Sequence, residues 1–181
     1  VNGTLRNNTS AYFATSSGSV GIGTTSPAEK LDIVGNGKFT NSGASDAVLS
    51  INSTFAAGYR ATLTLNNTHT GGKQFSIYST NDGDGVYAGG KLAFVNTTNS
   101  INSMVLDQQG ILGIRSIPTS WGSAYTGLQV GSQGAAIMGQ TRGEYLAISS
   151  NWYNDGTDRY RVSAFSTLYV QDDGKIGRAH V

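Results

Sequence analysis

The sequence contains no cysteine, which excludes disulfides, zinc–thiolate centres and thiol nucleophiles. Charge is also scarce: 13% of the residues are Asp, Glu, Lys or Arg, and the net charge is +1. A nearly neutral chain lacks the basic surface by which proteins attract nucleic acids or acidic membranes. The sequence also has no apolar run near the length that crosses a bilayer. We therefore expect no nucleic-acid partner and no membrane insertion.

Residues that favour helices are sparse, and residues that favour turns are abundant. Gly, Ser, Thr and Asn together make up 79 of the 181 residues. The hydrophobic fraction of 38% is nevertheless too high for a disordered chain. This composition predicts an all-β protein built from many short strands.

A cassette of about 20 residues occurs twice. Its first copy is GSVGIGTTSPAEKLDIVGNG (18–37), and its second is GILGIRSIPTSWGSAYTGLQVGSQG (110–134). The alignment pairs Gly21 with Gly113, Ile22 with Ile114, Pro27 with Pro118, and LDIVGNG with LQVGSQG. A third copy begins at DDGKIG (172–177). An internal repeat of this kind favours a modular, extended architecture.

The first cassette predicts a strand, a short helix and a second strand. Val20 and Ile22 alternate with glycines that permit close backbone approach or positive φ. Ser26 before a proline, with Glu29 three residues later, is typical of a helix start with a capping box. The following glycines limit that helix to about one turn, before an extended segment at Leu31 and Ile33. The residues that we expect to shape the cassettes are Gly21, Gly23, Ser26, Pro27, Glu29, Gly113 and Pro118.

The glycines do not form a phosphate-binding motif. A P-loop ending at Gly37 and Lys38 would need glycine where Asp32 stands, and Ser or Thr where Phe39 stands. The dinucleotide-binding series also fails, because Ser26 occupies its last glycine position. We therefore expect no nucleotide and no other cofactor.

The regions between the cassettes show strands with one apolar face. In 44–109 these are AVLSI, ATLTL, QFSIY, KLAFV and SMVLD, separated by turns rich in Asn, Gly and Asp. Region 135–175 supplies AAIM, EYLAISSNWY, DRYRVSA and TLYVQ, with YNDGTD as a hairpin turn. The pattern predicts short antiparallel modules of sandwich or jelly-roll type.

The cassette VGIGTTSPAEKL, preceded by SSG, resembles the repeated cassette of bacteriophage tail fibres and related trimeric virion fibres. Segment 61–114 is similar to the β-rich modules between such cassettes, and LAISSNWYNDGTDRYRV (146–162) resembles a second module type. The resemblance extends from about residue 16 to residue 174. The second cassette departs from the family form, with Arg115 in place of Gly23.

The resemblance implies an intertwined homotrimer in the tail fibre of a virion, made in the host cytoplasm and joined to other virion tail proteins. Trimerisation would also cover exposed sheet edges. The expected parts are an N-terminal fibre segment (1–43), a β-rich module (44–109), the second cassette (110–134) and a smaller β-rich module (135–175). We expect IGRAHV (176–181) to be a non-native tail, because it resembles a translated sequencing adaptor.

Aromatic residues are the candidates for ligand contact. Rings beside Asn and Asp are typical of glycan-binding surfaces, although the same rings can simply pack against a neighbouring module. The candidates for contact with bacterial surface polysaccharide are Tyr59, Tyr78, Tyr87, Trp121, Trp152, Tyr153 and Tyr160. Weak contacts of this kind become effective when several copies bind together.

Catalytic and metal sites are not indicated. NDGDG (81–85) favours a tight turn over a calcium loop, because the twelfth loop position is Leu92. His69 lacks partners for a metal or a catalytic triad. A tailspike-like polysaccharide depolymerase is the alternative, with Glu144, Asp155 and Asp158 as its carboxylates to test. A bacterial adhesin fragment is another. We expect a protein that is not an enzyme.

Overall fold

A computed structural model of the chain describes most of the sequence. The described residues are 18–41, 43, 46–54, 58–87, 89–118, 121, 125–131, 135–140, 145–154, 158–160, 167–172 and 175–180, with backbone alone for 152–154, 158–160 and 178–180. The chain divides into two compact units, residues 1–50 and 51–181.

The first unit contains the first cassette as a pair of parallel strands. Strand β1 (Val20–Ile22) pairs with β2 (Leu31–Ile33), and Gly21 lies opposite Asp32. The pairing continues beyond the strands, because the Val34 amide donates to the Ile22 carbonyl at 2.9 Å. Both strands predicted from the cassette are confirmed.

The short helix predicted after Ser26 is wrong, since residues 24–30 form bends. The Ser26 amide donates to Thr24 Oγ1 at 3.2 Å, so it does not bond to Glu29 as a capping box requires. The Ala28 amide donates to Asp32 Oδ2 at 3.0 Å. With β2 already beginning at Leu31, too few residues remain to offset the cost of starting a helix.

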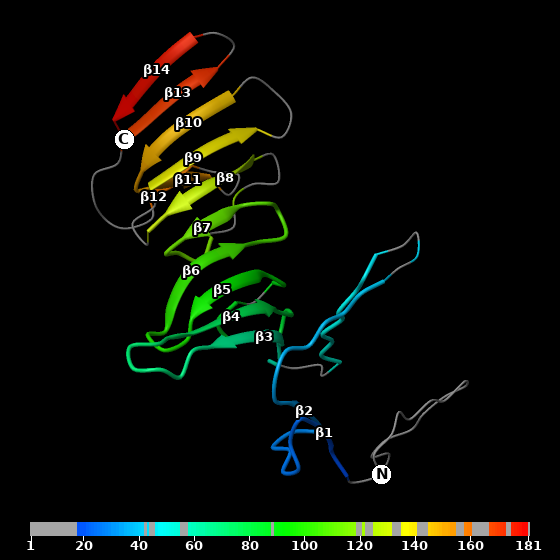
Figure 1. Ribbon diagram of the computed structural model, residues 1–181. Helices are drawn as coiled ribbons and strands as arrows, with labels where there is room; N and C mark the ends of the chain where they lie inside the picture. Colours follow the sequence, from blue (N-terminus) through cyan, green and yellow to red (C-terminus); the bar gives the residue numbers. More distant parts are fainter. Residues whose placement is uncertain are drawn as a thin grey trace. The chain divides into compact units, whose positions relative to one another are not determined.

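The second unit is built on one sheet of ten strands (Figure 1), in the order β14-β13-β10-β9-β8-β7-β6-β5-β4-β3. Neighbouring strands are antiparallel, except for the parallel pair β7–β8. The strands are β3 (Ala61–Asn66), β4 (Gln74–Ser79), β5 (Leu92–Asn96), β6 (Ile101–Leu106), β7 (Leu112–Ile114), β8 (Tyr125–Val130), β9 (Ala135–Gln140), β10 (Tyr145–Ser150), β13 (Thr167–Asp172) and β14 (Lys175–His180). A separate hairpin pairs β11 (Trp152–Asn154) with β12 (Asp158–Tyr160).

The all-β class predicted from composition is confirmed, with strands at nearly every predicted position. The arrangement of the modules differs from the prediction, because the described strands of both modules continue one sheet through the second cassette and do not form two facing sheets. AVLSI (47–51) is not a strand. Strand β14 runs into the segment expected to be a non-native tail. In the described part of the chain, no helix is long and apolar enough to span a membrane.

The second cassette repeats the local structure of the first. Strands β7 and β8 pair in parallel, with Gly113 opposite Gln129 as Gly21 is opposite Asp32. A Cβ on Gly113 would lie 2.4 Å from the Ser116 carbonyl oxygen, and a Cβ on Gly21 would lie 2.4 Å from the Thr24 oxygen. Each cassette therefore needs glycine where its turn folds back over its first strand.

One exchange between the cassettes keeps the backbone but adds strain. Gly23 has a φ of +75°, and Arg115, at the matching position, has a φ of +56°. A residue with a Cβ is disfavoured in this left-handed region, whereas glycine is not. The two cassettes thus share a left-handed backbone conformation at this position, which is occupied by glycine in the first cassette and by arginine in the second.

The two faces of the ten-stranded sheet differ in what covers them. On the covered face, the chain's own connections pack over the strands, and its buried residues include Ser76, Ala93, Val95, Val105, Gln129, Ala136, Met138, Ala147 and Leu168. The connections contribute Tyr87, Ile111 and Trp121, each at most 3% exposed. The core of the unit therefore lies between the sheet and its connections.

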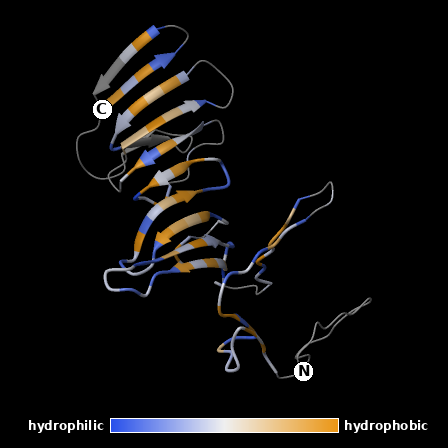
Figure 2. Cartoon of the chain, viewed as in Figure 1, coloured by the Kyte–Doolittle hydropathy of each residue, from blue (hydrophilic) through white to orange (hydrophobic). Residues whose placement is uncertain are grey.

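The other side, the open face, carries the alternate residues of the same strands. Its apolar side chains meet in cross-strand rows that pass from one sheet end toward the other, such as Leu92, Leu106, Leu112, Leu128, Ile137, Ile148 and Tyr169. Figure 2 shows apolar residues recurring along the strands from β3 to β13. None of the described side chains on this face carries a charge.

Candidate functional site

The connection between β4 and β5 is shaped by a tight turn at its start. The Asp84 amide donates to the Asn81 carbonyl at 3.2 Å, and the Gly83 amide donates to Asn81 Oδ1 at 3.1 Å. An asparagine side chain that bonds to the backbone two residues ahead stabilises such a turn. The turn predicted for NDGDG is therefore present, and it places Asp84 at the sheet.

Asp84 is 1% exposed and fully hydrogen-bonded. Its Oδ1 accepts from the Val86 and Tyr87 amides, each at 2.9 Å, and from Arg60 Nη2 at 3.0 Å. Its Oδ2 accepts from Arg60 Nε. These bonds, that from Arg60 above all, hold the pKa of Asp84 far below its ordinary value. The same pairing raises the pKa of Arg60.

Two tyrosine rings hold the Arg60 guanidinium from its other sides. Its central carbon lies 4.7 Å from the ring centre of Tyr78 and 5.0 Å from that of Tyr87. The two rings are 6.2 Å apart and tilted by 55°. Cation–π contacts of this kind fix an arginine more firmly than an ion pair alone. Arg60 is thus held in one orientation.

Tyr87 in turn positions an amide on the sheet. Its hydroxyl donates to Asn102 Oδ1, and its burial raises the pKa of Tyr87. A β-bulge lies at this point, where the register between β5 and β6 shifts between Phe94 and Val95. Because of the bulge, Asn102 pairs with Val95 on the covered face.

These groups surround a pocket of about 280 Å³ on the covered face. Its lining contains both polar and apolar groups. The lining residues are Arg60, Tyr78, Val86, Tyr87, Val95, Thr97, Ser100 and Asn102. We call this the Arg60 pocket. Ser100 lies in the β5–β6 turn with a φ of +53°, which is uncommon for a residue other than glycine.

The open face is the second candidate site. Eleven of its large side chains are between 38% and 70% exposed: Leu63, Leu65, Phe75, Leu92, Leu106, Val130, Ile137, Leu146, Ile148, Tyr169 and Ile176. The first cassette presents the same kind of patch in its own unit, through Ile22, Leu31, Ile33 and Val34. A monomer seldom leaves so much contiguous apolar surface in water.

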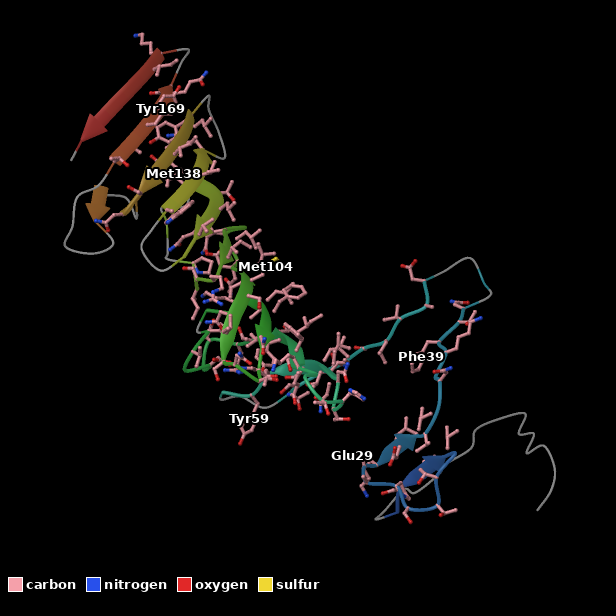
Figure 3. All side chains as sticks on the ribbon, turned by 60° about the vertical axis from the view of Figure 1, so that its left-hand side comes forward. Glu29, Phe39, Tyr59, Met104, Met138 and Tyr169 are labelled. Carbon is pink, nitrogen blue, oxygen red and sulfur yellow. The ribbon has the colours of Figure 1, made fainter. Side chains whose placement is uncertain are left out.

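The predicted glycan contacts fall into four groups. Tyr78 and Tyr87 line the Arg60 pocket, although Tyr87 is itself 3% exposed. Tyr59 is 62% exposed, and its side chain projects away from the strands (Figure 3). Trp121 is 3% exposed and packs in the core, so it presents no ring to a ligand. The side chains of Trp152, Tyr153 and Tyr160 lie outside the described part of the structure.

In the described part of the chain, the weaker candidates do not come together in a site. Among the described residues, no group of three His, Cys, Asp or Glu side chains could hold a metal ion. Asp82 is exposed in its turn, and so is His69. Glu144 and Asp155, and the side chain of Asp158, lie outside the described residues.

The pairing of Arg60 with Asp84 could not have been found by motif. Arg60 and Asp84 are 24 positions apart and belong to no recognisable sequence pattern. In the sequence, Asp84 stands out only as a residue of a turn. Aspartate is common in turns, so this position does not indicate a buried ion pair. The open face was readable in part, because alternation within single strands predicted apolar faces.

Comparison with known proteins adds no functional assignment. No protein-family model matches the chain, and no curated protein matches it.

Proposed function

We propose that this chain is a structural, non-enzymatic segment of a bacteriophage tail fibre, or of a similar virion fibre, that assembles as a homotrimer and takes part in host attachment. The observation that carries the proposal is the open face of the ten-stranded sheet. This face is apolar, uncharged among its described side chains, and continuous across the strands. The cassette repeat, with its matching structure in both units, supports the fibre assignment.

The size of the open face is comparable to a stable interface. The eleven most exposed of its large side chains together expose on the order of 800 Å² of apolar surface, about what one partner buries in a standard interface. Burying that area contributes on the order of 20 kcal/mol per chain as an upper bound. This free energy exceeds the lower estimates of what association costs in lost translational and rotational freedom.

A second and third copy of the chain fit this surface better than an unrelated partner. The face offers no described charge by which a different protein would be selected. Identical sheets share strand spacing and side-chain rows, so their apolar ridges can interdigitate along the length of the sheet. Three open faces turned toward one axis also give a closed assembly.

Attachment to bacterial surface glycans would use the opposite side of the sheet. The connections on the covered face remain outside such an assembly, and three copies present them together. Weak binding at each copy then combines into effective attachment. In this proposal the chain acts in the virion, beside other tail proteins, after synthesis in the host cytoplasm.

The test is the solution mass of the whole chain by light scattering after size exclusion, over a range of dilutions. We expect three chains per particle. Ile148→Lys places a charge among Ile137 and Tyr169 on the open face and should give a folded monomer. Gln109→Lys, in the exposed β6–β7 turn, is the control and should remain trimeric. A monomeric wild-type chain would overturn the proposal.

A further inference from the structure

We propose that the Arg60 pocket binds a single neutral sugar unit, such as the terminal or branch residue of a surface polysaccharide. The inference rests on the proposed attachment function and names its site and ligand class. It is carried by the chemistry of the pocket, in which fixed donors, acceptors and apolar walls converge on a space of about 280 Å³. Space of this order holds one sugar ring, below the size of sites for drug-sized ligands.

The polar groups of the pocket offer both donors and acceptors. Nε and Nη2 of Arg60 bind Asp84, which leaves the two N–H groups of Nη1 for a ligand. Asn102 uses its oxygen for the Tyr87 hydroxyl, so its amide group provides two more donors. The Thr97 hydroxyl donates to the Gln74 carbonyl at 3.0 Å, so toward a ligand it can only accept. The Ser100 hydroxyl can accept as well as donate. A sugar ring needs this mixture, because each of its hydroxyls both donates and accepts.

The charge in the pocket favours a neutral ligand. Arg60 is the only charged residue among the described lining residues, and Asp84 already pairs with two of its nitrogens. The pair is close to neutral overall, so an anionic ligand would compete with a buried carboxylate for the guanidinium. The rings and methyl groups of Tyr78, Val86 and Val95 supply the apolar wall against which the C–H surface of a sugar can pack.

The pocket is also built before any ligand arrives. Asp84 fixes Arg60 from one side and two tyrosine rings fix it from others. The β-bulge brings Asn102 to the pocket side of the sheet, and Ser100 is held at a positive φ at its rim. Uncommon backbone geometry and bulges both recur at functional sites. A site fixed in advance loses less entropy on binding.

The position of the pocket agrees with multivalent attachment. Tyr78, Val95 and Asn102 lie on the covered face, away from the open face that copies of the chain would share. Each chain of an assembly therefore presents its own pocket. Millimolar affinity at one pocket would suffice when several bind one polysaccharide.

The test uses saturation-transfer NMR on the whole chain with methyl glycosides of glucose, galactose and mannose, and with N-acetylglucosamine. Glucuronic acid and inorganic phosphate are the anionic comparisons. We expect saturation transfer to at least one neutral sugar. Binding should weaken at least tenfold in Asn102→Ala and in Thr97→Val. Thr126→Val is the matched control, because Thr126, like Thr97, donates its hydroxyl to a backbone carbonyl, yet it lies outside the pocket.

Each outcome decides the matter. Binding of the anions alone would overturn the neutral ligand class. Absence of binding, or binding that both pocket variants retain while folded by circular dichroism, would overturn the site. A trimer without sugar binding would overturn the pocket and leave the fibre proposal standing. A monomer whose sugar binding falls in both variants would overturn the trimer and leave the pocket standing.

Discussion

The two faces of the ten-stranded sheet have similar strand geometry but opposite surroundings. On β9, Met138 is 1% exposed on the covered face, and its neighbour Ile137 is 47% exposed on the open face. Both are large apolar side chains, so their hydrophobicity does not explain the difference. The connections between strands do, because in the described part of the chain they bring Tyr87, Ile111 and Trp121 to one side only.

This difference separates two tasks within one sheet. The covered face stabilises the chain by itself, through a core that the connections complete. The open face leaves apolar side chains exposed to water in the single chain, and binding to another molecule would bury them. A fold that exposes one sheet face across its strands is suited to assembly, and substitutions on one face at a time can test the contrast.

The largest contrast is expected between neighbouring residues on β9. Met138→Ala should lower the free energy of unfolding by about 3 kcal/mol, because it leaves a cavity in the core. Ile137→Ala should lower it by less than about 1 kcal/mol when both are measured in the Ile148→Lys background, which keeps the open face free of partners. Denaturant unfolding measures both. Equal losses would show that the open face is covered within one chain.

A second contrast lies in the connection that covers β4 to β6. Asp84→Ala removes a buried carboxylate that accepts four hydrogen bonds, and it leaves Arg60 partly buried without its partner. We expect a loss of about 2–3 kcal/mol, at the low end for a buried pair because Arg60 is 27% exposed. Asp82→Ala, in the same turn but exposed, should change stability by less than about 0.5 kcal/mol. A similar effect of both would contradict the assigned role of Asp84.

The sequence predicted the strands well, because each strand carries its own signal. ATLTL and QFSIY alternate apolar and polar residues, and β3 and β4 follow. The cassette repeat also aligned two segments that fold alike, since the register of β1–β2 is that of β7–β8. Local patterns of this kind need no knowledge of the rest of the chain.

The sequence could not predict what depends on distant parts of the chain. The capping pattern at Ser26 favoured a helix, but the Ser26 amide donates to Thr24 Oγ1 and the Ala28 amide donates to Asp32 Oδ2, and these bonds shape a turn. The aromatic candidates were all plausible surface residues, yet Trp121 lies in the core. The ion pair of Arg60 with Asp84 joins residues far apart in the sequence, and no local pattern signals it. The same holds for the continuation of one sheet through both modules.

The third test concerns the close packing of a turn against Gly113 on the covered face. Gly113→Ala would place a methyl group 2.4 Å from the Ser116 carbonyl oxygen and 3.0 Å from Pro118 Cδ, so the turn would have to move. We expect a loss of about 2 kcal/mol in denaturant unfolding. Gly85→Ala, where a methyl group would meet nothing within 4 Å, is the control and should be nearly neutral. If Gly113→Ala were also neutral, the turn would not be packed against β7.

The smallest expected effect is a loss of folding stability at acidic pH, and it comes from a residue on the covered face, Asp84. The pKa of Asp84 is lowered by folding, so the stability it contributes is present above its ordinary value of 3.8 and is lost as the pH falls below it. The loss attributable to Asp84 should reach about 1 kcal/mol at pH 3. To measure it, the free energies of unfolding of the wild type and of Asp84→Ala are compared at pH 6 and at pH 3. The difference between the two proteins should be smaller at pH 3.

The open face has no described charged side chain, so the assembled mass should be constant from pH 5 to pH 8 and between low and high salt. A mass that fell with salt would mean that charged groups, and not this apolar face, hold the copies together.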